Sequence, residues 1–200
     1  MSKKKSFFVS FEGIEGSGKS YQSLRLFENL KKKKIQSFLT REPGGTKAAE
    51  KIREVILDDY FHKNLNEQFD KYTDTLLYLA ARNEHVKNKI KPLVKKKKII
   101  ICDRFVDSTL AYQVYGKKVD KVLVDTVHKF ILGKTIPDLT FVLKVNISKS
   151  MKRLNMRKVK NRYDKFSTNF YSQVQKAFLN IAKKNKKKYF IIDNSNDSID

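Results

Sequence analysis

Short apolar runs alternate along the chain with longer stretches in which apolar residues recur every three or four positions. Continuous runs of this length predict buried strands, and the three-to-four period predicts helices. Strands that alternate with helices are typical of an α/β fold, so we expect a five-stranded parallel sheet flanked by helices. The expected strands are Phe7–Phe11, Ile35–Thr40, Ile99–Cys102, Leu139–Val145 and Tyr189–Asp193.

The helical stretches fill the intervals between these runs. Thr46 and Ser148 are expected caps, and Pro92 is expected to kink or end the helix before it. A polar interval, His62 to Phe69, is an expected loop. The helices are expected at residues 19–32, 47–56, 70–91, 108–115, 120–132, 148–158 and 165–184. There is no long linker, so residues 1–200 are expected to form one domain.

Composition narrows the class of protein. The net charge is +23, but the lysine runs each precede an expected strand, so we expect them at the amino ends of the sheet, away from a ligand site at the carboxyl ends. The first residues lead into a strand and not into a signal peptide. There is no apolar run long enough to span a membrane. Cys102 is the single cysteine and an expected core residue, which favours a reducing, cytoplasmic setting.

One motif follows the first strand directly. It fits the pattern G-x-x-x-x-G-K-[ST], whose glycines let backbone N–H groups surround a phosphate chain at a helix start. Its lysine contacts the β- and γ-phosphates and its hydroxyl ligates Mg²⁺. The residues are Gly13, Ile14, Glu15, Gly16, Ser17, Gly18, Lys19 and Ser20. The sequence therefore predicts a nucleoside triphosphate site.

Further polar residues follow the expected strands. Asp103 and Arg104 come after the third strand, and this pair suits a site for a metal and a phosphate. Tyr78 and Arg82 are four apart and share one face of a helix, so an aromatic ring and a fork of hydrogen-bond donors can meet one ligand there. The three histidines, His62, His85 and His128, have no metal-ligand spacing.

Five segments in order resemble the bacterial thymidylate kinases: FEGIEGSGKS, TREPGGT, LLYLAAR, CDRFVDSTLAYQ and PDLTFVL. The resemblance covers residues 7–193. It implies a P-loop kinase fold with a short mobile lid near residues 150–165, and transfer of the γ-phosphate of ATP to dTMP with Mg²⁺, for dTTP synthesis in DNA replication. It also implies a homodimer. The family usually has another helix after the last strand, and residues 195–200 would be only the beginning of such a helix.

The resemblance assigns residues to the acceptor. It implies that Arg104 clamps the dTMP phosphate and that Asp103 lies near the metal. The turn after the second strand would line the acceptor site, and Glu15 would lie near the deoxyribose. The remaining substrate contacts implied or suggested are Glu42, Pro43, Gly44, Arg53, Tyr78, Arg82, Ser108, Tyr112 and Gln113.

The P-loop contains no arginine, although some members of this family carry a catalytic arginine there. The lid must then supply the charge that stabilises the transferred phosphoryl group. Arg157 and Arg162 are the candidates.

Two alternatives stay open. The first is a P-loop kinase with another acceptor, such as dUMP or a deoxynucleoside. The second is a P-loop ATPase that binds nucleic acid, which the charge would favour but which leaves the TREPGG and LAYQ segments unexplained. We therefore expect small-molecule substrates and no specific nucleic acid or membrane partner.

Overall fold

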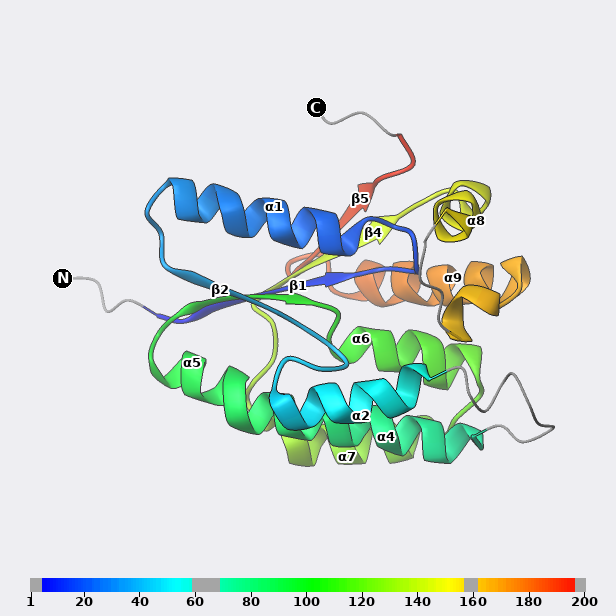
Figure 1. The fold of residues 1–200 in the computed structure, drawn as a ribbon, viewed down its shortest axis with the longest axis horizontal. Helices are drawn as coiled ribbons and strands as arrows, with labels where there is room; N and C mark the ends of the chain where they lie inside the picture. Colours follow the sequence, from blue (N-terminus) through cyan, green and yellow to red (C-terminus); the bar gives the residue numbers. More distant parts are fainter. Residues whose placement is uncertain (1–4, 59–68, 157–161, 197–200) are drawn as a thin grey trace.

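A computed structural model describes residues 5–58, 69–156 and 162–196 of the chain. It contains a five-stranded sheet of order β2-β3-β1-β4-β5, and every pair of neighbouring strands is parallel (Figure 1). The predicted α/β architecture is confirmed. The strands are β1 (Phe7–Glu12), β2 (Ser37–Arg41), β3 (Ile99–Asp103), β4 (Leu139–Lys144) and β5 (Tyr189–Asp193).

The sheet brings the ends of β1 and β3 together. The two strands are adjacent, and Phe11 of β1 lies opposite Asp103 of β3. In the sheet, β2 and β3 lie toward one edge from β1, whereas β4 and β5 lie toward the other edge. The strand order therefore reverses direction at β1. Open α/β sheets bind ligands at such a switch point, beyond the carboxyl ends of the strands. The Gly13–Ser20 motif follows β1 at this position.

Helices cover both faces of the sheet (Figure 1). α1 packs over β1, β2 and β3, whereas α9 lies on the opposite face beneath β4 and β5. α2 packs on α4, and α4 contacts α7. The helices are α1 (Lys19–Lys32), α2 (Lys47–Leu57), α4 (Lys71–His85), α5 (Lys91–Lys95), α6 (Val106–Thr109), α7 (Lys121–Leu132), α8 (Ile147–Asn155) and α9 (Thr168–Lys184).

The core follows the apolar pattern of the strands. Ile100, Ile101 and Cys102 are fully buried in the central strand β3, so the expectation that Cys102 is a core residue is confirmed. Phe8 and Phe105 meet edge to face, with ring centroids 4.9 Å apart. These contacts anchor the start of the chain segment that leaves β3 toward the site.

Within the described ranges two π-helical segments interrupt the helices, and neither was expected. The first, Val86–Ile90, joins α4 to α5, and helical backbone continues through Pro92 to Lys95. The prediction that the helix ends near Lys91 is therefore wrong. Pro92 lies in the first turn of α5. There its missing N–H is tolerated.

The second π-helical segment, Leu110–Gly116, follows α6 and carries Tyr112 and Gln113. The Lys117 N–H donates to the Tyr112 carbonyl at 2.9 Å, which closes its wide last turn. Wide turns of this kind are frequent at functional sites. Here the segment brings both side chains into the wall of the cavity described below.

The starts of α8 and α9 differ from the prediction in their caps or in what precedes them. Asn146, and not Ser148, caps α8: its Oδ1 accepts the Ser148 N–H at 3.0 Å. Asparagine caps as well as serine and comes first in the chain. α9 begins at Thr168 behind the cap Ser167, because a short 3₁₀ turn occupies Arg162–Lys165. The Thr46 cap of α2 is confirmed.

The described lysine runs precede β2, β3 and β5, at the amino ends of these strands as expected. No helix within the described ranges combines the length and the apolar character that crossing a membrane requires. Most of the expected loop His62–Phe69 lies outside the described residues.

Candidate active site

The loop after β1 has the backbone that its glycines permit. Gly13, Gly16 and Gly18 all have positive φ angles, and Gly18 is the residue before α1. The first turn of α1 leaves backbone N–H groups without partners inside the helix, and they point toward the loop. The loop can therefore surround an anion at a helix N-terminus.

The outer side of this loop is fastened to the rest of the protein. Three of its carbonyl groups, those of residues 15, 16 and 17, each accept a hydrogen bond from a distant side chain. The donors are Ser150 Oγ at 2.6 Å, Arg153 Nη1 at 3.0 Å and Asn194 Nδ2 at 2.8 Å. Since these bonds hold the carbonyls outward, they stabilise the conformation that turns N–H groups inward.

Lys19 lies folded over the loop, with its Nζ donating to the Ile14 carbonyl at 2.6 Å. Burial and the nearby positive charge of Arg104 lower the pKa of Lys19 to about 7, against the pull of Asp103 and Glu15. A phosphate chain beside Nζ would favour the protonated form. The lysine is thus placed to respond to an anionic ligand.

Ser20 and Asp103 form an oxygen pair beside Lys19. The Ser20 hydroxyl donates to Asp103 Oδ2 at 2.5 Å. The other carboxylate oxygen, Asp103 Oδ1, is buried and has no hydrogen-bond partner among the described residues. A hydroxyl and a carboxylate next to a phosphate loop are the donors that Mg²⁺ uses, since it takes few protein ligands and keeps phosphate oxygens and water. These residues fit a magnesium ion.

Arg104 lies between the phosphate loop and a cavity. Its Nη2 pairs with Glu15 Oε1 at 2.8 Å, and its Nη1 donates to the Gly13 carbonyl at 2.9 Å and to Ser108 Oγ at 3.0 Å. The guanidinium is 5.2 Å from the centre of the Tyr112 ring. Burial raises the pKa of Glu15, but Arg104 and Lys19 outweigh it and hold that pKa below its ordinary value. Glu15 also accepts a hydrogen bond from the Tyr112 hydroxyl.

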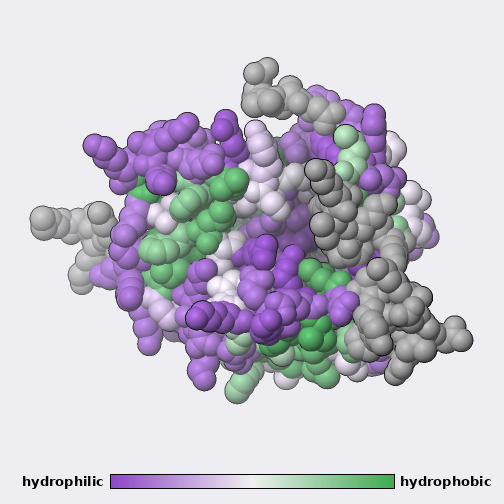
Figure 2. Space-filling model, viewed as in Figure 1, coloured by the Kyte–Doolittle hydropathy of each residue, from purple (hydrophilic) through white to green (hydrophobic). Residues whose placement is uncertain are grey.

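The cavity opens at the carboxyl edge of the sheet, and Figure 2 shows hydrophilic side chains around a hollow near the centre of the face drawn. The Lys19 and Ser20 side chains of the loop line this cavity together with most of the expected acceptor residues. Its walls are Glu15, Lys19, Ser20, Arg41, Glu42, Pro43, Arg53, Leu57, Tyr78, Arg82, Asp103, Arg104, Ser108, Thr109, Tyr112, Gln113 and Tyr163.

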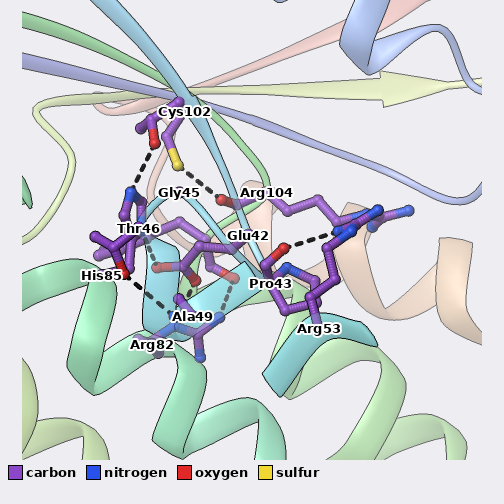
Figure 3. Close-up of polar contacts among 12 residues, drawn as sticks. Glu42, Pro43, Gly45, Thr46, Ala49, Arg53, Arg82, His85, Cys102 and Arg104 are labelled. Carbon is purple, nitrogen blue, oxygen red and sulfur yellow. Dashed lines mark hydrogen bonds and ion pairs between the residues drawn. The ribbon is translucent and has the colours of Figure 1, made fainter. Parts of the chain in front are cut away.

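One wall rests on a buried ion pair (Figure 3). Arg82 Nε donates to Glu42 Oε2 at 2.7 Å, and both side chains are 3% exposed. His85 Nδ1 lies 2.9 Å from the other Glu42 oxygen, and its Nε2 lies 2.7 Å from Thr40 Oγ1. Burial raises the pKa of Glu42, but the opposing effect of Arg82 and His85 is larger. The net pKa lies below the ordinary value of a glutamate, so the carboxylate stays charged. The wall is therefore a fixed charged framework.

His128 of α7 completes this framework. Its Nε2 lies 2.6 Å from Arg82 Nη1, which also donates to Thr109 Oγ1 at 2.6 Å. Burial and the charge of Arg82 lower the pKa of His128 to about 3. The imidazole is therefore neutral, and its Nε2 accepts a hydrogen bond from Arg82 Nη1. With the Phe105 carbonyl accepting from Nη2 at 2.8 Å, the guanidinium is held in one orientation.

Aromatic side chains form the opposite wall. Tyr78 and Tyr112 each meet the Tyr163 ring edge on, at 6.2 and 5.8 Å between centroids. Gln113 is 2% exposed, and its Nε2 has no hydrogen-bond partner within the part of the chain that the structure describes. A buried amide donor in a cavity wall requires a partner, so a polar ligand atom fits here.

The turn after β2 supplies the remaining contacts. Arg53 Nη1 donates to the Pro43 carbonyl at 2.8 Å, and both residues line the cavity (Figure 3). Gly44 and Gly45 have positive φ angles, and Gly44 lies against the Glu50 carboxylate. Pro43 lines the cavity, whereas Gly44 does not and shapes the turn instead.

The two candidate lid arginines have different outcomes. Arg157 lies outside the described residues, so its role stays a prediction. Arg162 is 6% exposed and pairs with the fully buried Asp74, which also pairs with Lys117 at 2.7 Å. Arg162 does not line the cavity, because this ion pair holds it in the protein interior. The structure therefore does not support Arg162 as the residue that contacts the transferred phosphoryl group.

Several residues of the site escaped the sequence interpretation. Thr109, Leu57 and Tyr163 line the cavity, and His85 and His128 hold its charged wall. The histidines are far apart in the sequence and have no common spacing. The one signal for Thr109 was its place between Ser108 and the Tyr112–Gln113 pair.

Comparison with known proteins agrees with this geometry. The family model "Thymidylate kinase" matches residues 11–200. A thymidylate kinase of Mycoplasma capricolum is 40% identical over 192 residues, 95% of this chain and 88% of the relative. One from Wolbachia pipientis wMel is 43% identical over 177 residues, 88% of this chain and 84% of the relative. The crystal structure of thymidylate kinase from Ehrlichia chaffeensis has a TM-score of 0.76 at 35% identity and covers 98% of this chain and 91% of its own. The chain belongs to the thymidylate kinase family.

Proposed function

We propose that this enzyme transfers the γ-phosphoryl group of ATP to the phosphate of dTMP, which gives ADP and dTDP for dTTP synthesis. The observation that carries the proposal is one continuous cavity. Lys19 and Ser20 of the phosphate loop line it together with Tyr78, Arg82 and Gln113 of the acceptor walls. Donor and acceptor phosphates bound in it would meet beside Arg104.

The donor side holds and neutralises phosphate. The loop after β1 would bind the triphosphate through its N–H groups, with Lys19 beside the β- and γ-phosphates. Ser20 and Asp103 would hold Mg²⁺, which neutralises phosphate charge when it is bound. Phosphoryl transfer needs mainly alignment and charge neutralisation, so these groups suffice without a strong general base.

The acceptor side matches a pyrimidine deoxynucleotide. Tyr78 offers a ring for stacking on the base, and Gln113 Nε2 and Arg82 are donors for its carbonyl oxygens. Arg104 is placed for the acceptor phosphate, and the Glu15–Tyr112 pair lies next to it, where the sugar would lie. The apolar wall residues Pro43 and Leu57 would accommodate a methyl group.

A panel of acceptors tests the proposal. With ATP and Mg²⁺, we expect kcat/KM to be highest for dTMP and about tenfold lower for dUMP, since one methyl group in an apolar pocket contributes about 1–3 kcal/mol. Thymidine, which lacks the phosphate that Arg104 would hold, should be a poor substrate. A coupled assay for ADP measures all three. Faster turnover of dUMP or thymidine than of dTMP would refute this choice of acceptor.

We further propose that the enzyme is a homodimer. Apolar side chains stay exposed on three neighbouring helices: Val55 on α2 at 45%, Leu76 on α4 at 51% and Phe130 on α7 at 87%. Figure 2 shows hydrophobic surface where Figure 1 places α2 and α4. A large exposed apolar patch on a folded domain favours a protein partner.

Sedimentation velocity tests the dimer. The wild type should sediment at twice the chain mass of 23.4 kDa. Phe130→Glu and Leu76→Glu should give monomers, because each would bury a charge in the interface. Leu24→Glu on α1, 43% exposed in the wild type, is the matched control and should stay dimeric. A monomeric wild type would contradict the proposal.

A further inference from the structure

The backbone at Arg104 is strained. Its φ angle is +69°, in the left-handed region that a side chain with a Cβ rarely adopts. Such a conformation persists only where the surrounding structure holds it in place. Two contacts help: the Arg104 N–H donates to the Phe11 carbonyl at 2.9 Å, and the Cys102 thiol donates to the Arg104 carbonyl at 3.0 Å.

A third support comes from Glu12, the last residue of β1. Its side chain is fully buried, and its Oε1 accepts the N–H of Phe105, the residue after Arg104, at 2.8 Å. Its Oε2 accepts the Ser108 hydroxyl at 2.6 Å. The same hydroxyl oxygen accepts a hydrogen bond from Arg104 Nη1 at 3.0 Å. One carboxylate therefore contacts both the strained turn and the group that holds the Arg104 side chain.

A negative charge on Glu12 is costly in this buried position. Burial and the neighbouring Asp107 carboxyl raise the pKa of Glu12 to about 7, although the hydrogen bonds from Ser108 and Phe105 and the charge of Arg104 favour the carboxylate. An apolar residue in this buried position would avoid that cost. It would also leave the Phe105 N–H without an acceptor and free the Ser108 hydroxyl to turn.

We propose that Glu12 is a positioning residue that orients Arg104 toward the acceptor phosphate through the Phe105 amide and the Ser108 hydroxyl. This inference rests on the proposed function, in which Arg104 holds the phosphate of dTMP. Glu12 itself does not line the cavity and needs no contact with substrate.

The test compares the affinities for the two substrates in Glu12→Gln. Glutamine keeps the size and one carbonyl oxygen, but its NH₂ group cannot accept the Ser108 hydroxyl proton. We expect the Kd for dTMP, measured by calorimetry without ATP, to rise about tenfold, as for one charge-assisted hydrogen bond. The Kd for ATP should stay within about twofold, and the KM for dTMP should rise more than kcat falls.

Asp107→Asn is the matched control. Asp107 is 4% exposed and lies one residue from Ser108, but its side chain bonds Tyr189 on β5 and neither of the groups that Glu12 holds. Because Asp107→Asn also removes a carboxyl that raises the pKa of Glu12, it favours the Glu12 carboxylate, and its Kd for dTMP should be no more than about twofold above that of the wild type. If the role of Glu12 were purely structural, Glu12→Gln would instead lower the melting temperature and weaken the binding of dTMP and ATP to the same extent.

Three results would overturn the inference: an unchanged Kd for dTMP in Glu12→Gln, a parallel loss of dTMP and ATP binding, or equal effects of Glu12→Gln and Asp107→Asn. If Glu12→Gln does not fold, Glu12→Asp keeps the charge but is too short to reach both donors, and it should show the same selective loss. The wild type is measured first. Failure of the wild type to bind dTMP would refute the proposed function, and the comparison would then use the acceptor that the wild type does bind.

Discussion

Replacement of Arg104 by alanine is expected to abolish most binding of the acceptor and to leave ATP binding nearly intact. The side chain reaches Glu15, Gly13 and Ser108 at 2.8–3.0 Å and lies where the two phosphates would meet. Loss of a buried, charged contact to phosphate costs about 3–5 kcal/mol. The Kd for dTMP should therefore rise by roughly two to three orders of magnitude. The kcat/KM for dTMP should fall by at least the same factor.

Calorimetry with dTMP and with ATP separates the two effects. Arg104→Lys keeps the charge but loses the planar fork, so it should be intermediate. Arg25→Ala is the control, since this α1 arginine is exposed and its ion pair within the described residues is a long one, with Glu28 across 3.9 Å. An Arg104→Ala variant that binds dTMP like the wild type would disprove the role given to this residue.

Gly45→Ala should strongly destabilise the acceptor turn. A Cβ at Gly45 would lie 2.5 Å from His85 Cδ2 and 2.7 Å from Thr40 Oγ1, and the φ angle is +91°. His85 cannot move aside easily, because it bonds Glu42 and Thr40 inside the protein. Steric overlap and backbone strain together cost about 3–5 kcal/mol.

Thermal unfolding measures this effect. The melting temperature should fall by about 10 °C, at about 2–4 °C for each kcal/mol in a protein of this size. Gly133→Ala is a matched control: its φ angle is +58°, but nothing lies within 4 Å of the added Cβ. It should lose only the cost of the backbone conformation, about 1–3 kcal/mol. Equal melting temperatures for the two variants would show that the contacts with His85 and Thr40 do not constrain the turn.

Local patterns predicted the parts of this protein that local forces determine. The Gly13–Ser20 loop, the buried strands and the four-residue spacing of Tyr78 and Arg82 depend on residues near one another in the chain, and the structure has them as expected. The strand-end residues Glu12, Arg41 and Asp103 gather at one edge because parallel strands share a direction.

Contacts between distant side chains could not be read in the same way. Nothing in the sequence near His128 indicates that it meets Arg82, 46 positions away. The pairing of Arg162 with Asp74 is equally non-local, and it removes from the cavity an arginine that the sequence offered for catalysis. The π-helical segments were missed because apolar periodicity does not distinguish a wide turn from an ordinary one.

The three bonds that fasten the outer carbonyls of the phosphate loop have a thermodynamic consequence. Ser150, Arg153 and Asn194 hold the loop in its curved shape through bonds that do not involve the nucleotide. A flexible loop would lose conformational entropy when ATP arrives, whereas folding has already ordered this one. The binding free energy of the triphosphate is therefore not reduced by the cost of ordering the phosphate loop. A larger part of this binding free energy can then align the γ-phosphate with the acceptor.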